Sequence, residues 1–336
     1  MKQLNKNYPK VLFSVVTFNE EKRIEECISA IKNLDYPEEC IKIVVADAGS
    51  KDKTLEILKK FRVEITNNIY QFAEPGHVLN AKNFDADYFV FVAADNIILG
   101  KDWLTSMLKV FIENHEVIIS TPLVKISKDD CAISNYLNYD TDPFNSFFYF
   151  NGSNPRFFDK KFGMIKKNEF YKIYKNLPLN PPLLALAQCT MIDKKRFIRF
   201  ERKLSFEDIK KIDDLKAVFD NIEKSGNFSV SIKSYILHKS VKSLGDFYNK
   251  FNNRIRFSIK TNMFENREKY FSNMFTLRKY LFLILASLPI YQLIIAVFRF
   301  LKDKHLFHFY YPVTSFILAY IIIKNYFLIN VVNKKR

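Results

Sequence analysis

The most constraining feature of this chain is the alternation, from Val11 to about Val124, of short apolar runs with runs of helical spacing. Apolar residues at steps of three and four indicate amphipathic helices, and short continuous apolar runs are typical of buried strands. The expected strands are Val11–Thr17, Ile41–Ala46, Val63–Thr66, Tyr88–Val92 and Val117–Thr121, and the expected helices are Glu20–Lys32, Thr54–Phe61 and Trp103–Glu113. This order predicts an α/β fold with a Rossmann-like, mostly parallel sheet.

The composition narrows the class of protein. Hydrophobic residues make up 48% of the 336 residues, which excludes general disorder. The formal net charge of +16 fits nucleic acid, an anionic membrane surface or phosphorylated ligands, or it reflects only a lysine-rich composition. Much of the positive charge flanks an apolar C-terminal tail, so we expect no nucleic-acid partner. The four cysteines lack zinc-site spacing, and we expect them to be reduced.

Polar residues follow the first two expected strands. Thr17-Phe18-Asn19-Glu20 ends the first, and the run from Asp47 to Thr54 follows the second. Ligands of open parallel sheets bind at the carboxyl ends of strands. We therefore expect Asp47 to accept hydrogen bonds from a nucleobase or a ribose. For Ser50 and Asp52 the alternative is that they cap the next helix.

Asp95 follows the strand Tyr88–Val92 and is the candidate metal ligand. Magnesium and manganese ions choose oxygen ligands and often keep only one or two protein carboxylates. An ion held there would neutralise a leaving diphosphate. The alternative is an aspartate that only shapes a turn.

These segments together resemble glycosyltransferase family 2, with its GT-A fold, over about 11–240. The matching runs are SVVTFNEE, VVADAGSKDKT, PGHVLNAKN (Pro75–Asn83) and FVAADN. Ala93 stands where the family's DXD-type metal motif has its first aspartate, and only Asp95 remains. The resemblance implies a nucleotide-sugar donor, with Mg²⁺ or Mn²⁺ as cofactor. It implies donor contacts from Thr17, Asn19, Glu20, Asp47, Ser50, Lys82, Asn83, Ala94 and Asp95.

The resemblance also implies a catalytic base and a second metal ligand. Inverting members carry a carboxylate base about a dozen residues before a glycine, which favours Asp214 and then Asp213, both ahead of Gly226. Glu207 is a further candidate, and helix-dipole stabilisation is the alternative role for such a carboxylate. Many members place a histidine where His238 lies, close to the metal or the diphosphate; a structural histidine is the alternative.

The C-terminal third predicts membrane association. Apolar residues from Leu244 to Ile259 recur at helical steps among lysines and arginines, which indicates a basic amphipathic helix that lies at a membrane or packs on the core. Tyr280–Phe298 and Leu306–Ile323 contain no Asp, Glu, Lys or Arg and barely reach the length of a membrane span. They predict a spanning hairpin or, alternatively, a hairpin that lies in one leaflet.

These observations give the expected organisation. The ranges are 1–240 for a GT-A catalytic domain with an acceptor insertion at 131–182, 241–279 for basic interfacial helices, and 280–332 for a two-helix membrane hairpin. We expect an inverting glycosyltransferase that acts on a lipid-linked acceptor, a polyprenyl phosphate or a lipid-linked glycan, at the cytoplasmic face of a membrane. The alternative is a catalytically impaired binding protein that keeps the fold.

Overall fold

A computed structural model describes residues 8–149, 154–175, 187–196, 227–260 and 274–333. The helix expected at Lys210–Ser225 and the base candidates Glu207, Asp213 and Asp214 lie outside the described residues. The chain divides into two compact units. The first comprises Met1–Lys125 and Phe158–His238, and the second comprises Ile126–Phe157 and Lys239–Arg336. Each unit is described by itself.

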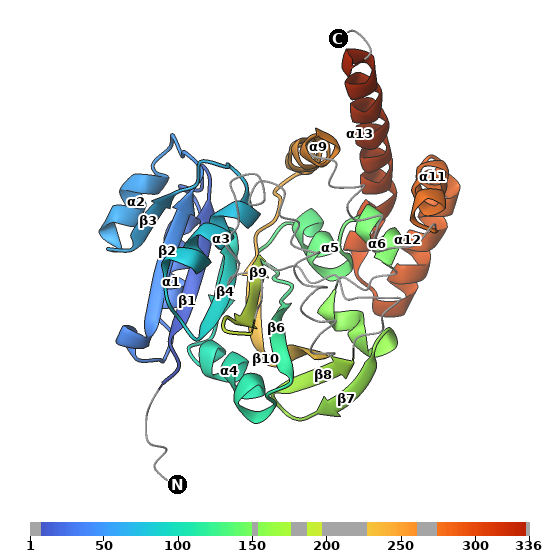
Figure 1. Cartoon of the computed structure of the whole chain (residues 1–336). Coiled ribbons are helices and arrows are strands. Elements are labelled where there is room, and N and C mark those ends of the chain that lie inside the picture. The colour runs from blue at the N-terminus through green and yellow to red at the C-terminus, as the bar shows by residue number, and fades with distance from the viewer. Residues whose placement is uncertain (1–7, 150–153, 176–186, 197–226, 261–273, 334–336) are drawn as a thin grey trace. The chain divides into compact units, whose positions relative to one another are not determined.

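The first unit is built on a sheet that contains ten strands among the described residues, in the order β3-β2-β1-β4-β9-β6-β10-β8-β7, with β5 paired to β10 (Figure 1). The strands are β1 Val11–Thr17, β2 Ile41–Asp47, β3 Glu64–Asn67, β4 Tyr88–Ala93, β5 Asn96–Leu99, β6 Val117–Val124, β7 Gly163–Lys167, β8 Tyr171–Lys175, β9 Gln188–Asp193 and β10 Asn227–His238. The mixed, mostly parallel α/β fold expected from the sequence is confirmed.

Strand β1 holds the centre of the parallel part of this sheet. It pairs in parallel with β2 on one side and with β4 on the other. In this register Thr17 lies opposite Asp47, and Val16 lies opposite Ala93. The last residues of the three strands therefore meet at one edge, which is the edge where ligands bind in open α/β sheets.

Helices cover both faces of the sheet, which explains why the strands read as continuous apolar runs. The helices of this unit are α1 Ile24–Lys32, η1 Glu38–Cys40, α2 Thr54–Lys60, α3 Ala73–Asn83, α4 Trp103–Glu113 and the short η2 Pro155–Lys160, which ends in it. Residues from α1, α2 and α4 share one core with Val11, Phe13 and Val15 of β1. Leu12 of β1 packs in the second core with residues of α3.

Several elements differ from those that the periodicity predicts. Helix α1 begins at Ile24 rather than Glu20, and the residues before it form a turn in which the backbone N–H groups of Arg23 and Ile24 donate to the carbonyl oxygen of Glu20. Helix α3 and strand β5 were not expected. For the range 131–182 the sequence predicts no firm secondary structure. The structure has two α-helices in its first part and the hairpin β7–β8 at the sheet edge in its second.

Gly76 allows α3 to approach the sheet closely. A Cβ atom added there would lie 2.8 Å from Nδ2 of Asn68 and 3.1 Å from the side chains of Ala46 and Val16. Ala46 and Val16 belong to the carboxyl halves of β2 and β1. The first turn of α3 is thereby seated beside the strand ends that form the candidate site.

The second unit consists of helices among the described residues. They are α5 Ala132–Asp140, α6 Pro143–Tyr149, α9 Leu244–Lys260, α11 Met274–Ala286, α12 Pro289–Asp303, η4 Leu306–Phe309 and α13 Tyr310–Asn333. Within this unit α13 packs against α9, α12, α11 and α6. The amphipathic helix expected from Leu244 onward is present as α9.

The described residues contain one helix that is long and apolar enough to cross a membrane, Leu306–Leu328. A second passes the same test only if Tyr280–Ala286 and Pro289–Asp303 count as one span, and these two pieces are bent by 86°. The first apolar run of the sequence is thus two helices at an angle. Pro289 begins the second of them, in the first turn, where proline is tolerated.

Replacing Gly76 with alanine should destabilise the first unit. The added methyl group meets side-chain atoms of Asn68, Ala46 and Val16 at 2.8–3.1 Å, and overpacking of this kind costs about 1–3 kcal/mol. Chemical denaturation of Gly76→Ala should show that loss in the free energy of unfolding. The control is Gly163→Ala, where nothing lies within 4 Å of the added atom and a change below about 0.5 kcal/mol is expected. Equal effects of both changes would contradict the close approach of α3.

Candidate active site

The candidate site is formed by three turns at the carboxyl ends of β1, β2 and β4. Thr17 and Asp47 are register partners at the ends of their strands. The backbone N–H of Ala94 donates to the carbonyl oxygen of Val16 at 3.2 Å, which holds the turn of Asp95 beside the end of β1. The sequence-based candidates Thr17, Asp47, Ala94 and Asp95 are therefore brought together.

Asp47 organises the turn between β2 and α2. Its Oδ2 accepts the backbone N–H groups of Gly49 and Ser50, both at 2.9 Å, and its Oδ1 accepts the Ser50 hydroxyl at 2.5 Å. Gly49 adopts φ 89°, a left-handed conformation that glycine takes without strain. Oδ2 thereby uses both of its lone pairs, whereas Oδ1 keeps one. The side chain thus shapes the loop and offers one remaining lone pair, on Oδ1, to a ligand.

Asn19 ties the turn after β1 to the turn after β2. Its backbone N–H donates to the Ser50 hydroxyl at 2.9 Å, and its Oδ1 accepts the backbone N–H of Lys51 at 2.8 Å. Asn19 has φ 55°, in the left-handed region where asparagine is among the more tolerant residues. The two candidates Asn19 and Ser50 therefore join the loops to each other.

Glu20 and Asp52 continue this connection. The carboxylate of Glu20 forms an ion pair with Arg23 at 2.6 Å. Asp52 accepts the backbone N–H groups of Glu21 and Thr54, and Thr54 begins α2. Burial opposes the ionised form of Asp52, but the hydrogen bonds from Thr54 and Glu21 outweigh it and lower the pKa of this carboxyl. The capping alternative for Asp52 matches these contacts.

Phe18 is a functional candidate that the sequence reasoning passed over. It lies between Thr17 and Asn19, and 56% of the residue is exposed. An exposed aromatic ring beside a cluster of acceptors is suited to stack on a flat heterocycle. The sequence signal that could have identified Phe18 is the aromatic position of the first matching run, SVVTFNEE. The hydroxyl of Thr17, just before it, is buried without a hydrogen-bond partner among the described residues.

Asp95 and His238 face each other across the end of the sheet. Strand β5 begins one residue after Asp95 and runs antiparallel to β10, with Asn96 opposite His238. Nε2 of His238 consequently lies 3.5 Å from Oδ2 of Asp95. The side-chain amide of Gln188, on β9, lies 2.9 Å from Nδ1 of His238. An amide offers a donor and an acceptor, so Gln188 supports either histidine tautomer.

Asp95 and His238 fit a divalent cation only in part. Within the described ranges no group of three or more histidine, cysteine, aspartate or glutamate side chains is arranged to hold a metal ion. One carboxylate and one imidazole would supply two ligands, and Mg²⁺ or Mn²⁺ sites of this type take the rest from substrate phosphates and water. The pair therefore suits an ion that arrives with a diphosphate.

Lys82 and Asn83 are not brought to this edge. They end α3, and the following residue, Phe84, stacks its ring 4.7 Å from Nζ of Lys42. Lys42 is the second residue of β2, whereas Asp47 is the last. Five residues of strand separate them, or about 17 Å. A charged contact from Lys82 to a diphosphate beside Asp95 does not match this placement.

One of the buried residues of α3 beside the sheet is His77. Its Nδ1 lies 3.0 Å from the hydroxyl of Ser14 on β1, and the amide of Asn80 donates to the same hydroxyl at 2.9 Å. Asn80 also accepts the Thr66 hydroxyl at 2.8 Å. Burial lowers the pKa of His77 to about 3. A neutral polar network thus fixes α3 behind the strand ends.

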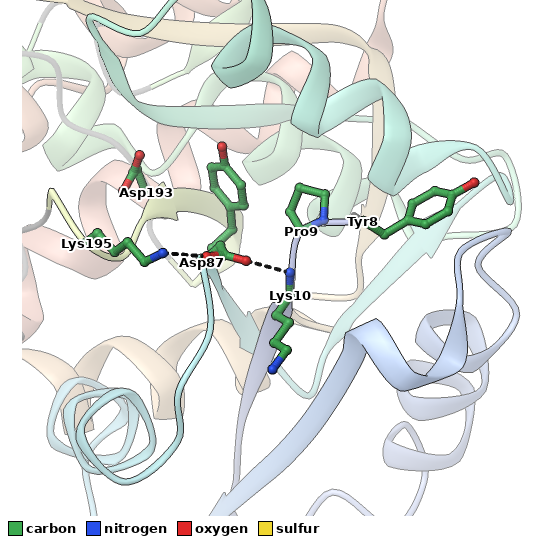
Figure 2. Close-up of a pocket in the computed structure, with 7 residues that line it drawn as sticks. Tyr8, Pro9, Lys10, Asp87, Asp193 and Lys195 are labelled. Carbon is green, nitrogen blue, oxygen red and sulfur yellow. Dashed lines mark hydrogen bonds and ion pairs between the residues drawn. The ribbon is translucent and has the colours of Figure 1, made fainter. Parts of the chain in front are cut away.

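A hollow of about 400 Å³ lies at the opposite edge of the sheet. Figure 2 shows its lining, in which Asp87 accepts the backbone N–H of Lys10 and the Nζ of Lys195. Lys10 directly precedes β1 and Asp87 directly precedes β4, so the hollow faces the amino ends of these strands. Both of its carboxylates are already paired, Asp87 with Lys195 and Asp193 with Arg196, and we do not assign the donor to it.

Comparison with known proteins gives a family and a fold. Residues 13–178 match the sequence model described as glycosyl transferase family 2. A dolichyl N-acetyl-alpha-D-glucosaminyl phosphate 3-beta-D-2,3-diacetamido-2,3-dideoxy-beta-D-glucuronosyltransferase of Methanococcus voltae is 34% identical over 92 residues, 24% of this chain and 27% of that protein. The poly(ribitol-phosphate) beta-N-acetylglucosaminyltransferase TarS of Staphylococcus aureus is 30% identical over 115 residues, 32% of this chain and 20% of that protein.

Among solved structures, a mannosyltransferase resembles most of the chain. The mannosyltransferase PcManGT of Pyrobaculum calidifontis, in complex with GDP-Man and Mn²⁺, superposes with a TM-score of 0.55 at 14% identity, over 95% of this chain and 88% of that one. At this identity the likeness shows the fold. The matched segments of the two sequence relatives are about a quarter and a fifth of those proteins.

The neutral state of His77 predicts a pH dependence of stability. A histidine whose folded pKa is far below the unfolded value of about 6.5 takes up its proton only on unfolding. The free energy of unfolding should therefore fall as the pH drops below about 6.5, by up to about 1.4 kcal/mol per pH unit. Denaturation of His77→Gln between pH 7 and 4 should show a shallower slope than the wild type. His115→Gln, at an exposed position, should keep the wild-type slope; identical slopes for all three proteins would refute the assignment.

Proposed function

This chain belongs to glycosyltransferase family 2, and we propose that it moves a sugar, with inversion, from a nucleoside-diphosphate sugar to a lipid-linked acceptor at the cytoplasmic face of a membrane. The observation that carries the proposal is the meeting of three polar turns at the carboxyl ends of β1, β2 and β4. That edge combines an exposed aromatic ring, a carboxylate with one spare lone pair and a carboxylate–imidazole pair.

The donor site is proposed to run from Phe18 to Asp95. The nucleobase would stack on Phe18, and Asp47 would accept a base N–H or a ribose hydroxyl with the free lone pair of Oδ1. The turn built by Asn19 and Ser50 keeps both groups in place, because its hydrogen bonds join the two loops. The diphosphate would then reach Asp95, at the end of the next strand.

Asp95 and His238 are proposed to hold the divalent cation together with the diphosphate. When bound, the cation supplies a Lewis acid that neutralises charge on the leaving nucleoside diphosphate. Gln188 would orient His238 from its other ring nitrogen, the usual role of an outer partner of a metal-binding histidine. Ala93, at the first position of the motif, contributes no ligand.

The transfer itself breaks the bond between the anomeric carbon and the diphosphate oxygen, and the nucleoside diphosphate leaves with the electron pair. An acceptor hydroxyl oxygen forms the new bond from the opposite face and gives its proton to a carboxylate base. Asp214, followed by Asp213 and Glu207, remains the sequence-based proposal for that base. A polyprenyl phosphate acceptor attacks with an oxygen that is already ionised and needs no such base.

The proposal of a lipid-linked acceptor has two supports. The Methanococcus voltae relative is named for transfer to a dolichyl-linked sugar phosphate. In this chain the unit that contains the long apolar helix Leu306–Leu328 also contains 131–157, the first part of the proposed acceptor insertion. A second unit that associates with a membrane would lie close to a substrate that is confined to that membrane.

Removing the Phe18 ring should weaken binding of the donor nucleotide. Stacking of a base on an aromatic side chain is worth about 1–3 kcal/mol, so Phe18→Ala should raise the dissociation constant about 5- to 150-fold. Titration calorimetry of a panel of nucleotide-sugars, read against the free nucleoside diphosphates, measures this. Ile112→Ala is the control, since Ile112 lies on α4 and is equally exposed, at 58%.

Asp47→Asn belongs to the same titration. It keeps one oxygen for the turn but loses the charge, and loss of a charged hydrogen bond should cost about 1.5–3 kcal/mol of donor affinity. Wild-type affinity in both Phe18→Ala and Asp47→Asn would remove the donor from this edge of the sheet.

The cation should bind through Asp95 and His238 and only together with the nucleotide. Asp95→Asn and His238→Gln should each weaken Mn²⁺ binding in the presence of nucleoside diphosphate. Loss of a residue that only orients a metal ligand lowers metal affinity roughly 10- to 100-fold, and loss of a ligand itself should cost at least as much. Electron paramagnetic resonance of free Mn²⁺ reports this without turnover. Asp85→Asn is the control, because its side chain is 97% exposed and lies just before β4, at the amino end of that strand. Mn²⁺ affinity that is unchanged in both Asp95→Asn and His238→Gln would contradict the assignment of these residues as ligands of the cation.

A further inference from the structure

Helix α12 turns an apolar stripe outward and polar groups inward. Its exposed side chains recur at steps of three and four, from Ile290 at 77% exposed to Phe298 at 73%. They are Ile290, Leu293, Ile294, Val297, Phe298 and Leu301. The opposite side buries Gln292 and places Arg299 against Asp140 at 3.2 Å. A helix in water shows the reverse arrangement, so this face is built for an apolar surrounding.

Helix α13 also exposes an apolar stripe. This stripe comprises Val313, Phe316, Tyr320, Ile323 and Phe327. The buried side of α13 contains Thr314, Ser315 and Asn325 together with the apolar Leu318, Ala319, Ile321 and Ile322. Large apolar side chains are thus exposed along two consecutive helices of the second unit, which is far more than the scattered exposed residues of an ordinary surface.

Exposed cationic residues accompany these stripes. Lys302 and Lys304 directly follow the last residue of the α12 stripe, and Arg254 and Arg256 are exposed on α9, which packs against α13. Each lysine or arginine near an anionic lipid surface contributes about 1 kcal/mol. The combination of apolar stripes and cations fits the headgroup and acyl-chain boundary of an anionic bilayer.

The loop between α12 and α13 is tied to α5. Nδ1 of His308 lies 2.6 Å from Asp140, and Nε2 of His308 lies 2.8 Å from Asp303. Asp140 is the last residue of α5, which is about 14 Å long. Helix α5 begins seven residues after Lys125, the last residue of the first segment of the first unit. The chain from Lys125 to Asp140 would have to enter the membrane if this loop lay on the far side.

A later part of α13 is tied to α9. Nζ of Lys324 donates to the hydroxyl of Tyr248 at 2.9 Å, and the amide of Asn325 donates to Asn252 at 2.9 Å. Tyr248 follows His238, the end of the first unit, by only ten residues. The two tied positions, His308 just before α13 and Lys324 within it, are about 24 Å apart along the helix, and both contact helices that leave the first unit within 15 residues.

A crossing of the bilayer conflicts with these ties. The hydrocarbon core is about 30 Å thick, and a crossing α13 would draw in α5, with buried Asn135 and Asn138, or α9, with exposed Arg254 and Arg256. Helices α11 and α12 are about 20 and 22 Å long, and their 86° bend prevents them from forming one straight span.

We propose that α11, α12 and α13 lie in one leaflet of an anionic bilayer. The α12–α13 loop then lies on the same side of the membrane as the first unit, which contains the candidate active site. This inference deepens the proposed membrane association and rests on it. It selects the single-leaflet hairpin over the spanning hairpin, the two arrangements that the apolar runs of the sequence left open.

The sidedness can be tested on the full chain with single cysteines. Lys302→Cys reports the loop and Lys60→Cys, at the end of α2, reports the catalytic unit, each with Cys40 and Cys131 replaced by serine. In sealed cells an impermeant maleimide should label both positions or neither, and lysis should change both together. Labelling of one position without the other before lysis would show that the hairpin crosses and would overturn the proposal.

The occupant of the apolar face can be tested by flotation. The full chain should float with sealed vesicles of phosphatidylcholine and phosphatidylglycerol, and Ile294→Glu with Phe298→Glu should lower the bound fraction at least tenfold. Ile112→Glu, on the first unit, should bind as the wild type does. If the wild type instead forms a lipid-free dimer that the double change dissociates, the face covers a second copy and the proposal is wrong. Calorimetric donor affinity of the same variants separates this result from a failure of the proposed function.

Discussion

The parallel pairing of β1 with both β2 and β4 is the constraint on which the rest of the first unit depends. It sets Thr17 beside Asp47 and Val16 beside Ala93, so three turns must share one edge. Those turns have little room for independent movement, because Asn19, Ser50 and Asp52 bond across them. Burial of β1 on both faces fixes this register, since a slip by one residue would exchange its two cores.

Most polar residues of the matching motifs shape the site before they touch a ligand. Asp47 uses both oxygens on its own turn, and Asn19 joins two loops. The groups left to a donor are the one spare lone pair of Asp47, on Oδ1, the ring of Phe18 and the facing pair of Asp95 and His238. A preorganised turn of this kind reduces the ordering that binding would otherwise require.

The sequence predicted elements where one physical signal dominates. Strand β1 and helix α4 have the predicted bounds, because a buried apolar run and a strong helical period each decide the structure locally. Strand β5 was not expected, since four residues carry too little periodicity, and its pairing with β10 brings Asp95 to His238. The motif alone assigns Lys82 and Asn83 to the donor. It gives no information on the length of α3, and this helix places both residues toward the opposite edge of the sheet. The helices of the second unit depend on partners distant in sequence, as the contact of His308 with Asp140 shows.

Transfer of labelled sugar to lipid tests the central claim most directly. The purified chain is incubated with Mn²⁺, a panel of labelled nucleoside-diphosphate sugars and lipids extracted from membranes, and the organic phase is counted. One donor should give labelled lipid in wild type and in Asp85→Asn, and Asp95→Asn should lower the rate by about 100-fold or more, as loss of a group that acts on the leaving charge does. Release of free sugar without labelled lipid, or an Asp95→Asn rate equal to the wild type, would contradict a metal-assisted transfer to a lipid-linked acceptor.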